Sequence, residues 1–237
     1  MGMTLLAETS SPALARDELQ TRIRQMQATR LDEKTLPMPP GMESLLPEGL
    51  RAGASYSIDG SAAGAVTLAL ALLAGPSRQG AWCGVLGMPG LGTEAAAGLG
   101  VDLERLVLVP RPGDRWLTVA AAMADVLGMV LLAPPGRATA ADANRLAARL
   151  RQRGSTLLVL GDWPHAEATL RVATNRWEGL SDGHGRLRTR HLDVQSTGRS
   201  GRMRAIRLDL AERGHPIATA TGTAHSPSIR LVQGIAG

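Results

Sequence analysis

The chain has 237 residues, a formal net charge of +5 at pH 7 and no phenylalanine, so its core must be built mainly from Leu, Ala and Val. This length suffices for one sizeable domain with extensions. Because Cys83 is the single cysteine, an internal disulfide and a cysteine-based zinc site are excluded. The longest apolar stretch, residues 62–75, is too short to span a membrane, and there is no secretory signal pattern. We therefore expect a soluble, cytoplasmic protein.

Residues 1–40 are predicted to form a helical arm followed by a Pro-rich linker, because Ser11 and Pro12 give a favourable helix start. Apolar side chains then recur at helical spacing on an otherwise polar helix, at Leu14, Leu19, Ile23 and Met26. Such a stripe must be buried, either against its own domain or on a partner. We predict a partner-binding arm. Residues 35–43 contain three prolines and cannot continue a helix, so they read as a linker or strap.

Short apolar runs alternate with helical patterns in the first part of the domain that we assign to residues 41–213. The predicted strands cover residues 55–58, 82–87, 106–109, 129–133 and 156–160. A helix apolar on every face follows the first strand as far as Ala74, and further helices are predicted at residues 93–100, 114–127 and 139–153. This alternation indicates an α/β core whose mostly parallel central sheet is covered by helices on both faces.

The pattern changes after residue 163. Three strand-like runs follow without intervening helices, at residues 168–174, 186–195 and 202–210, and Gly/Ser-rich turns separate them. They predict antiparallel C-terminal strands that extend the sheet. Residues 214–237 are small and polar, and we predict a flexible tail there.

The first predicted strand, its turn and the following helix have the layout of a P-loop. The functional pattern is G-x-x-x-x-G-K-[ST], whose Lys meets the phosphates and whose hydroxyl holds Mg²⁺. Here Gly64 is followed by Ala65 and Val66. Gly60 is one residue too close to Gly64, and Asp59 stands at the correctly spaced position. The sequence therefore predicts a degenerate P-loop that keeps the scaffold and lacks the phosphate chemistry.

An active P-loop ATPase also needs an acidic residue at the end of a later strand, where it helps to hold Mg²⁺. The natural candidate strand ends at Ala133, which has no carboxylate. A second strand presents Asp162 near its end, where a turn or cap role is the simpler interpretation. With both the Lys and the acid missing, we expect a pseudo-ATPase that hydrolyses no ATP and needs no cofactor.

No other pattern in the sequence predicts catalysis or metal binding. The histidines have no H-x-x-x-H spacing; they are His165, His184, His191, His215 and His225. There is also no G-x-S-x-G elbow and no Cys/His constellation. We therefore expect no catalytic residues and no metal.

Residues 168–213 carry ten arginines against five acidic residues. Arg186, Arg188 and Arg190 alternate along one predicted strand, and Arg202 and Arg204 start the next; we call these five arginines the basic ribbon. The basic ribbon could follow a phosphate backbone, form a solvated edge that resists strand addition, or match an acidic partner protein. The lack of aromatic residues between the arginines argues against stacking on single-stranded bases.

Residues 45–210 resemble the RecA-like SulA/ImuA family, in its actinobacterial ImuA-type branch. The resemblance rests on three segments, LLPEGLRAGASYSIDGSAAGAVTLALALLA, GLGVDLERLVLVPRPGDRW and NRWEGLSDGHGRLRTRHLDVQSTGRSGRMR. The first is similar to the segment of RecA that leads into its P-loop, and this similarity indicates a RecA-like topology only. The third resembles a segment after the core that is more specific to the branch. The N-terminal helix occupies the place of the polymerisation arm of RecA.

The resemblance implies a non-catalytic accessory protein of the DNA-damage (SOS) response that supports translesion synthesis and induced mutagenesis. The implied partners are an ImuB-type inactive Y-family polymerase homologue and, through it, an error-prone C-family DNA polymerase, with recruitment to the nucleoid at damage. Contacts with RecA and a weak contact with DNA stay open. So do two other functions, a SulA-like inhibitor of cell division and a DNA-binding RecA-like protein with residual nucleotide binding.

Overall fold

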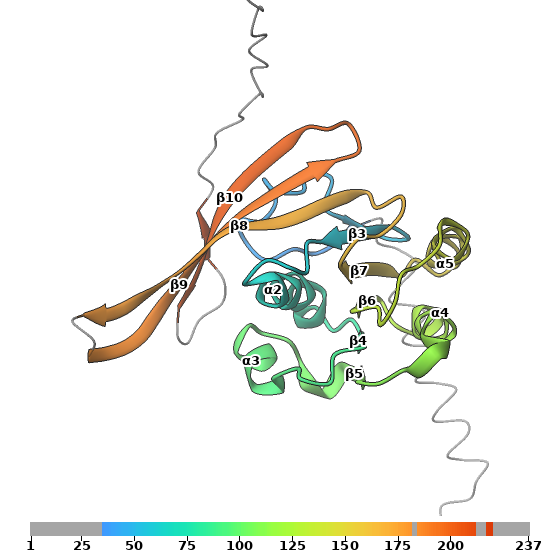
Figure 1. The fold of residues 1–237 in the computed structure, drawn as a ribbon, viewed down its shortest axis with the longest axis horizontal. Coiled ribbons are helices and arrows are strands. Elements are labelled where there is room, and N and C mark those ends of the chain that lie inside the picture. The colour runs from blue at the N-terminus through green and yellow to red at the C-terminus, as the bar shows by residue number, and fades with distance from the viewer. Residues whose placement is uncertain (1–34, 182–183, 212–216, 220–237) are drawn as a thin grey trace, which may run out of the picture.

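The structure, a computed structural model, describes residues 35–181, 184–211 and 217–219. One large twisted sheet dominates it, and helices flank the parallel half of this sheet (Figure 1). Within the described residues the sheet has nine strands in the order β11-β10-β9-β8-β3-β7-β6-β4-β5. A separate antiparallel pair joins β1 (Thr35–Leu36) to β2 (Leu50–Arg51). The expected α/β class, with a mostly parallel core and antiparallel C-terminal strands, is confirmed.

The parallel half of the sheet follows the predicted strands closely. It consists of β3 (Ser55–Ile58), β4 (Cys83–Leu86), β5 (Leu106–Val109), β6 (Met129–Leu132) and β7 (Thr156–Leu160). All pairings among these strands are parallel. β3, β4 and β6 are buried along their whole length, which explains why they read as continuous apolar runs.

Helices cover both faces of the parallel strands, with α2 and α3 on one face and α4 and α5 on the other (Figure 1). Their bounds are α2 (Ala65–Arg78), α3 (Thr93–Gly98), α4 (Trp116–Val126) and α5 (Ala140–Arg153), and short 3₁₀ turns lie at η1 (Leu103–Arg105) and η2 (Gly113–Arg115). A capping box begins α5, since the Thr139 hydroxyl accepts from the Asp142 amide and the Asp142 carboxylate accepts from the Thr139 amide.

A strap formed by residues 37–46 packs along α2 and helps to bury it on most sides. Pro39, Met42 and Leu45 of the strap are buried. The approach is close, because a Cβ placed on Gly75 of α2 would lie 2.4 Å from the Pro37 carbonyl oxygen. The strap interpretation of this Pro-rich segment is therefore confirmed. A helix enclosed in this way can be apolar on every face.

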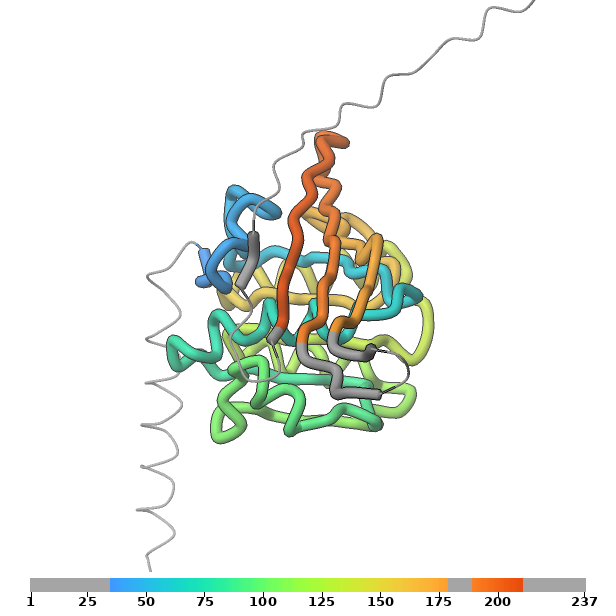
Figure 2. The backbone as a smooth tube through the Cα atoms, turned by 90° about the vertical axis from the view of Figure 1, so that its left-hand side faces the viewer, coloured from blue at the N-terminus to red at the C-terminus, as the bar shows by residue number. Residues whose placement is uncertain are grey.

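The C-terminal strands form an antiparallel extension, which we define as β8 (Ala168–Ser181), β9 (His184–Gly198), β10 (Met203–Ala211) and β11 (Ile217–Thr219). β8 and β9 are longer than predicted and cross the molecule side by side (Figure 2). The prediction of a flexible tail is wrong for β11, because the edge of β10 offers backbone groups with which these three residues pair.

The antiparallel extension has an apolar inner face and a polar outer face. The inner face packs on α2 through buried side chains that include Val172, Leu192, Val194 and Leu208. β8 joins the parallel half next to β3, where Thr169 pairs with Ser57. This single pairing makes one continuous sheet from the parallel and antiparallel halves.

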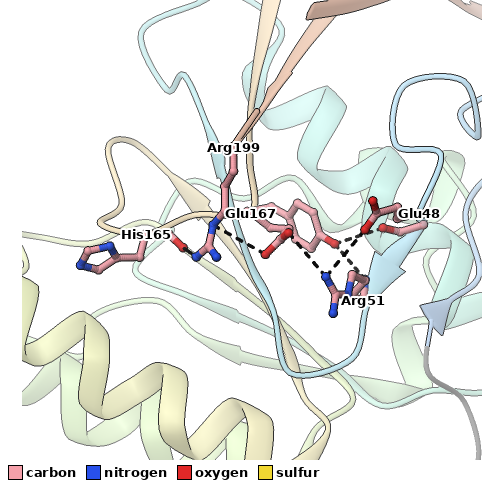
Figure 3. A network of polar contacts seen from close by, with 7 residues as sticks. Glu48, Arg51, His165, Glu167 and Arg199 are labelled. Carbon is pink, nitrogen blue, oxygen red and sulfur yellow. Dashed lines mark hydrogen bonds and ion pairs between the residues drawn. The ribbon is translucent and has the colours of Figure 1, made fainter. Parts of the chain in front are cut away.

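Polar contacts tie the β9–β10 turn to the body of the protein (Figure 3). Arg199 donates to the His165 carbonyl oxygen at 2.8 Å, and its Nε lies 3.8 Å from Glu167. Glu167 also lies 3.5 Å from Arg51, which is 3.7 Å from Glu48. Each pair is partly exposed and individually weak, but together they hold the far end of the extension. No helix within the described ranges is long and apolar enough to cross a membrane.

Candidate functional site

The P-loop-like turn lies between β3 and α2, and three of its backbone N–H groups, those of Ser61, Ala62 and Ala65, are bonded within the turn itself. The Ser61 amide donates to Asp59 Oδ1 at 3.1 Å, and the Ala65 amide donates to the Ala62 carbonyl oxygen at 3.0 Å. The Ala62 amide faces the Asp59 carbonyl oxygen at 3.4 Å. In a phosphate-binding turn such amides point at the ligand. Here they already have partners.

Asp59 provides this turn with an anion of its own. Its Oδ1 accepts hydrogen bonds from the Ser61 hydroxyl at 2.6 Å and from the Ser61 amide, and these bonds lower the pKa of the Asp59 carboxyl. Arg171 of β8, whose Nε lies 3.7 Å from Asp59 Oδ2, acts in the same direction more weakly. The carboxylate is therefore ionised at neutral pH and repels an approaching phosphate.

The first turn of α2 carries apolar side chains where the motif needs Lys and a hydroxyl. Ala65 is buried, and Val66 is 42% exposed. Gly64 has a φ of +104°, and a Cβ at this position would lie 3.0 Å from Leu192 Cδ2 and 3.4 Å from Arg190 Nη2. β9 therefore packs directly over the turn, which sequence reasoning did not anticipate.

The strand ends beside the turn offer one carboxylate. β6 is followed by Ala133, whose carbonyl oxygen would lie 2.1 Å from a Cβ on Gly87, so this strand end is closed by backbone packing. β7, the neighbour of β3, is followed by the exposed Asp162. Its loop is held against β3 by Ser57, whose hydroxyl donates to the Gly161 carbonyl oxygen at 2.6 Å. The first candidate strand thus lacks an acid, and the second keeps one.

Arg190 of β9 reaches α2 beside the turn. Its Nη1 donates to Thr67 Oγ1 at 2.5 Å and its Nε to Asn175 Oδ1 at 2.9 Å. Partial burial lowers the pKa of the Arg190 guanidinium, which stays charged because arginine titrates far above neutrality. Arg190 lies opposite Leu210 on the inner face. Its side chain closes the inner apolar row of the extension. Its place in a stripe with Arg186 and Arg188 stays a prediction.

Trp177 of β8 is a site residue that the sequence analysis missed. It pairs with Arg190 across the two strands, and the Arg190 guanidinium carbon lies 4.9 Å from its ring centroid, a cation–π distance. The ring remains 48% exposed. An aromatic residue therefore does lie among the arginines. The signal that could have located it is the hairpin register, which sets the two residues opposite each other.

The basic ribbon is spread along the extension. Arg202 lies just before β10 and Arg204 near its start, whereas the residue paired with Arg190 lies at the other end of β10, about 20 Å from Arg204. The side chains of Arg186 and Arg188 lie outside the described part of the structure, although their backbone belongs to β9. Of the ribbon arginines whose side chains are described, Arg190 adjoins the P-loop-like turn, and Arg171 of β8 reaches the same turn from outside the ribbon.

The outer face of the antiparallel extension carries a cross-strand row of charged groups. His191 Nδ1 lies 2.6 Å from Asp209 Oδ1, and its Nε2 lies 3.3 Å from Glu178 Oε2. The bond to Asp209, with a smaller effect of Glu178, raises the pKa of His191. Next along the strands, Arg207 Nε donates to Asp193 Oδ1 at 2.9 Å. This row stabilises a solvent-facing surface away from the turn.

The remaining predicted residues add no chemistry to the site. The arm residues Leu14, Leu19, Ile23 and Met26 lie outside the described residues. Within the ranges that are described, no group of three or more His, Cys, Asp or Glu side chains is placed to hold a metal ion. Cys83 is buried, and burial raises the pKa of its thiol to about 12, which makes it unreactive.

The fold and the site together define an α/β protein with a P-loop-like turn that lacks the Lys and the hydroxyl of the functional motif. Residues 44–165 match the family model described as MT3502 N-terminal domain. A Mycobacterium tuberculosis (strain ATCC 25618 / H37Rv) protein described as uncharacterized protein Rv3395c is 33% identical over 192 residues. This match covers 77% of the present chain and 93% of the mycobacterial one. The chain therefore belongs to the MT3502 N-terminal domain family.

Proposed function

We propose that the protein is a non-catalytic accessory protein of the DNA-damage (SOS) response, which supports translesion synthesis and induced mutagenesis through protein–protein contacts. Its partners are an ImuB-type inactive Y-family polymerase homologue and, through it, an error-prone C-family polymerase. The resemblance to the actinobacterial ImuA-type branch supports this role, and the mycobacterial source of the relative agrees with that branch.

The observation that carries the non-catalytic part is the closed P-loop-like turn. The amides of Ser61, Ala62 and Ala65 are bonded internally, Asp59 holds an ionised carboxylate there, and Leu192 and Arg190 pack over Gly64. A nucleotide would have to displace these contacts and would meet neither the Lys nor the hydroxyl that bind its phosphates and metal. A fold of this kind retains surfaces for binding other proteins, and we assign its role to them.

Isothermal titration with Mg-ATP tests the nucleotide part directly. We expect no micromolar binding by the wild-type chain and no hydrolysis. The double variant Ala65→Lys/Val66→Thr should not hydrolyse ATP either, because Ala133 still lacks the strand-end acid. Adding Asp59→Gly removes the repelling carboxylate and serves as the matched variant, in which binding without hydrolysis is the expected result. Micromolar binding or turnover by the wild-type chain contradicts the proposal.

Affinity purification of the tagged chain from cells with damaged DNA tests the partner part. The polymerase homologue and the error-prone polymerase should co-purify. A cell-division GTPase in their place would support the SulA-like alternative. Deletion of residues 1–34 should leave a folded core with an unchanged melting temperature and weaken the complex. If the shortened chain aggregates or melts much lower, the arm belongs to its own core and is not the docking element.

A further inference from the structure

We propose that the end of the antiparallel extension at Trp177 and Arg190 binds single-stranded nucleic acid, with a base stacked on Trp177 and the phosphates attracted by Arg190 and by the net positive charge of the C-terminal segment. This inference goes beyond the accessory function proposed above and does not depend on its partners. It rests on the distribution of charge, the setting of Trp177 and the shape of the β8 edge.

The net positive charge of the protein is concentrated in one segment. Residues 168–213 contain ten of the 26 basic and five of the 21 acidic residues, so this segment alone carries a formal net charge of +5. The remainder of the chain has equal numbers of both signs. An approaching polyanion is therefore attracted more strongly to the C-terminal segment than to the remainder of the chain taken as a whole.

Trp177 differs from the other tryptophans in its exposure. Trp116 and Trp163 are 7% exposed and Trp82 is partly buried, whereas Trp177 is 48% exposed. The Trp177 ring contributes little to the core because about half of it is in contact with solvent. Exposed aromatic rings on strands are surfaces on which the bases of single-stranded nucleic acids stack.

Arg190 holds this ring in a fixed setting. Its guanidinium lies against Trp177 while its hydrogen bonds to Thr67 and Asn175 anchor it to α2 and β8. Because the pair is ordered before a ligand arrives, binding costs little side-chain entropy. Val66, exposed in the first turn of α2 next to Thr67, adds apolar surface beside the pair.

The edge of β8 near Trp177 favours a nucleic acid strand over an added peptide strand. Register irregularities between Val172 and Thr174 and between Glu178 and Leu180 interrupt the regular edge that strand addition requires. Arg176 alternates with Trp177 along β8 and lies opposite His191, so its side chain belongs to the outer face near Asp193. The cation on the Trp177 side of the strands is Arg190. Duplexes hide the faces of their bases, so stacking on Trp177 selects a single strand.

Fluorescence anisotropy with a labelled short oligothymidylate at two salt concentrations tests the proposal on the full chain. Trp177→Ala should weaken binding about tenfold or more, the size of one base–aromatic stack, and Trp177→Phe should retain most of the affinity. Arg190→Ala should also weaken binding, because it removes the cation that lies against the Trp177 ring, and the affinity of the wild type should fall at the higher salt concentration. Arg145→Ala on α5, whose side chain is 83% exposed, is the charge-matched control and should bind as the wild type does.

Several results would overturn the proposal. They are undetectable binding at low salt, equal affinity of the wild type and Trp177→Ala, equal affinity for a duplex, and equal competition by polyglutamate, which would mean that charge alone attracts an acidic protein segment. Thermal unfolding of each variant is measured alongside. Because Trp177 is half exposed, Trp177→Ala should leave the melting temperature nearly unchanged. If Trp177→Ala does lower the melting temperature, Trp177→Phe, which keeps an aromatic ring, distinguishes a loss of stacking from a loss of folding.

Discussion

Asp59 and Arg190 lie on two sides of the start of α2 and carry opposite charges. The positive end of the helix, Arg190 and Arg171 all favour a negative charge at this point, and Asp59 supplies it from within the chain. The negative charge at this turn therefore comes from the protein itself. The turn keeps the strand–turn–helix layout of a P-loop, with Asp59 as its own anion.

The pH dependence of stability should report His191. Its pKa is raised above the ordinary value of 6.5, chiefly by Asp209, so the protonated form stabilises the folded state. That contribution is complete below pH 6.5 and is lost as the pH rises through the raised pKa. Arg176, opposite His191 in the register, opposes protonation, and Glu178 favours it. We therefore expect the free energy of unfolding of the wild type, measured in urea relative to that of His191→Gln, to fall as the pH rises from 6.5 through the raised pKa of His191. An unchanged difference contradicts the assignment.

Residue identity predicted which groups of the P-loop motif are missing at the turn but not the contacts that fill it. Ala65, Val66 and Ala133 are visible as missing groups in the sequence alone. The position of Arg190 depends on how β9 crosses α2, and that of Trp177 depends on the hairpin register. Both are set by tertiary pairing, which local patterns do not encode.

Among the elements, α2 decides how the two halves of the sheet fit together. Its sides contact the parallel strands, the antiparallel extension and the strap, which leaves little of it in water. The strap matters because it runs so close to Gly75 that only a hydrogen fits between the two backbones. A glycine inside the helix is therefore a packing requirement.

Gly75→Ala should destabilise the protein by about 1–3 kcal/mol, the usual cost of overpacking, although alanine is the better helix former by about 1 kcal/mol. The strap must shift to admit the methyl group, and a non-glycine residue before Pro76 adds to the strain. Gly98→Ala in α3 is the matched control, since nothing lies within 4 Å of its added Cβ. Equal urea midpoints for the two variants would show that the strap is loosely held.

The elements of the parallel half could be predicted because the local sequence pattern of each one agrees with its structure. β3, β5 and β7 have the predicted bounds, and the cap of α5 was visible in the sequence. The antiparallel extension was predicted too short, because β8 continues through Asn175, Arg176 and Glu178, polar residues on a partly solvated ribbon. β11 was missed because its pairing depends on the edge of β10.

In the whole molecule, β11 covers part of one edge of the large sheet. β5 is the edge strand at one end of the sheet, and at the other end the three residues of β11 pair with the backbone of part of β10. Without β11, the described part of β10 would present an unpaired row of backbone groups beside apolar inner-face residues, an arrangement that favours edge-to-edge association.

Two truncations separate the role of β11 from that of the rest of the tail. Removal of residues 212–237 should increase self-association, measured by light scattering against concentration, because it uncovers β10. Removal of residues 220–237 keeps β11 and should leave the protein as monodisperse as the full chain. If both truncations behave alike, β11 does not protect the edge.

The position of β3 in the middle of the sheet has a consequence for synthesis on the ribosome. Both of its neighbours, β7 and β8, come late in the chain; the bond from Ser57 to Gly161 already spans 104 residues. The hairpins from β8 to β10 close locally and fast, but β3 and α2 leave the ribosome long before β7, β8 and β9, which help to bury them in the folded protein. A helix that is buried on most sides in the folded protein is therefore exposed during much of translation, and we expect chaperones to bind the nascent chain early.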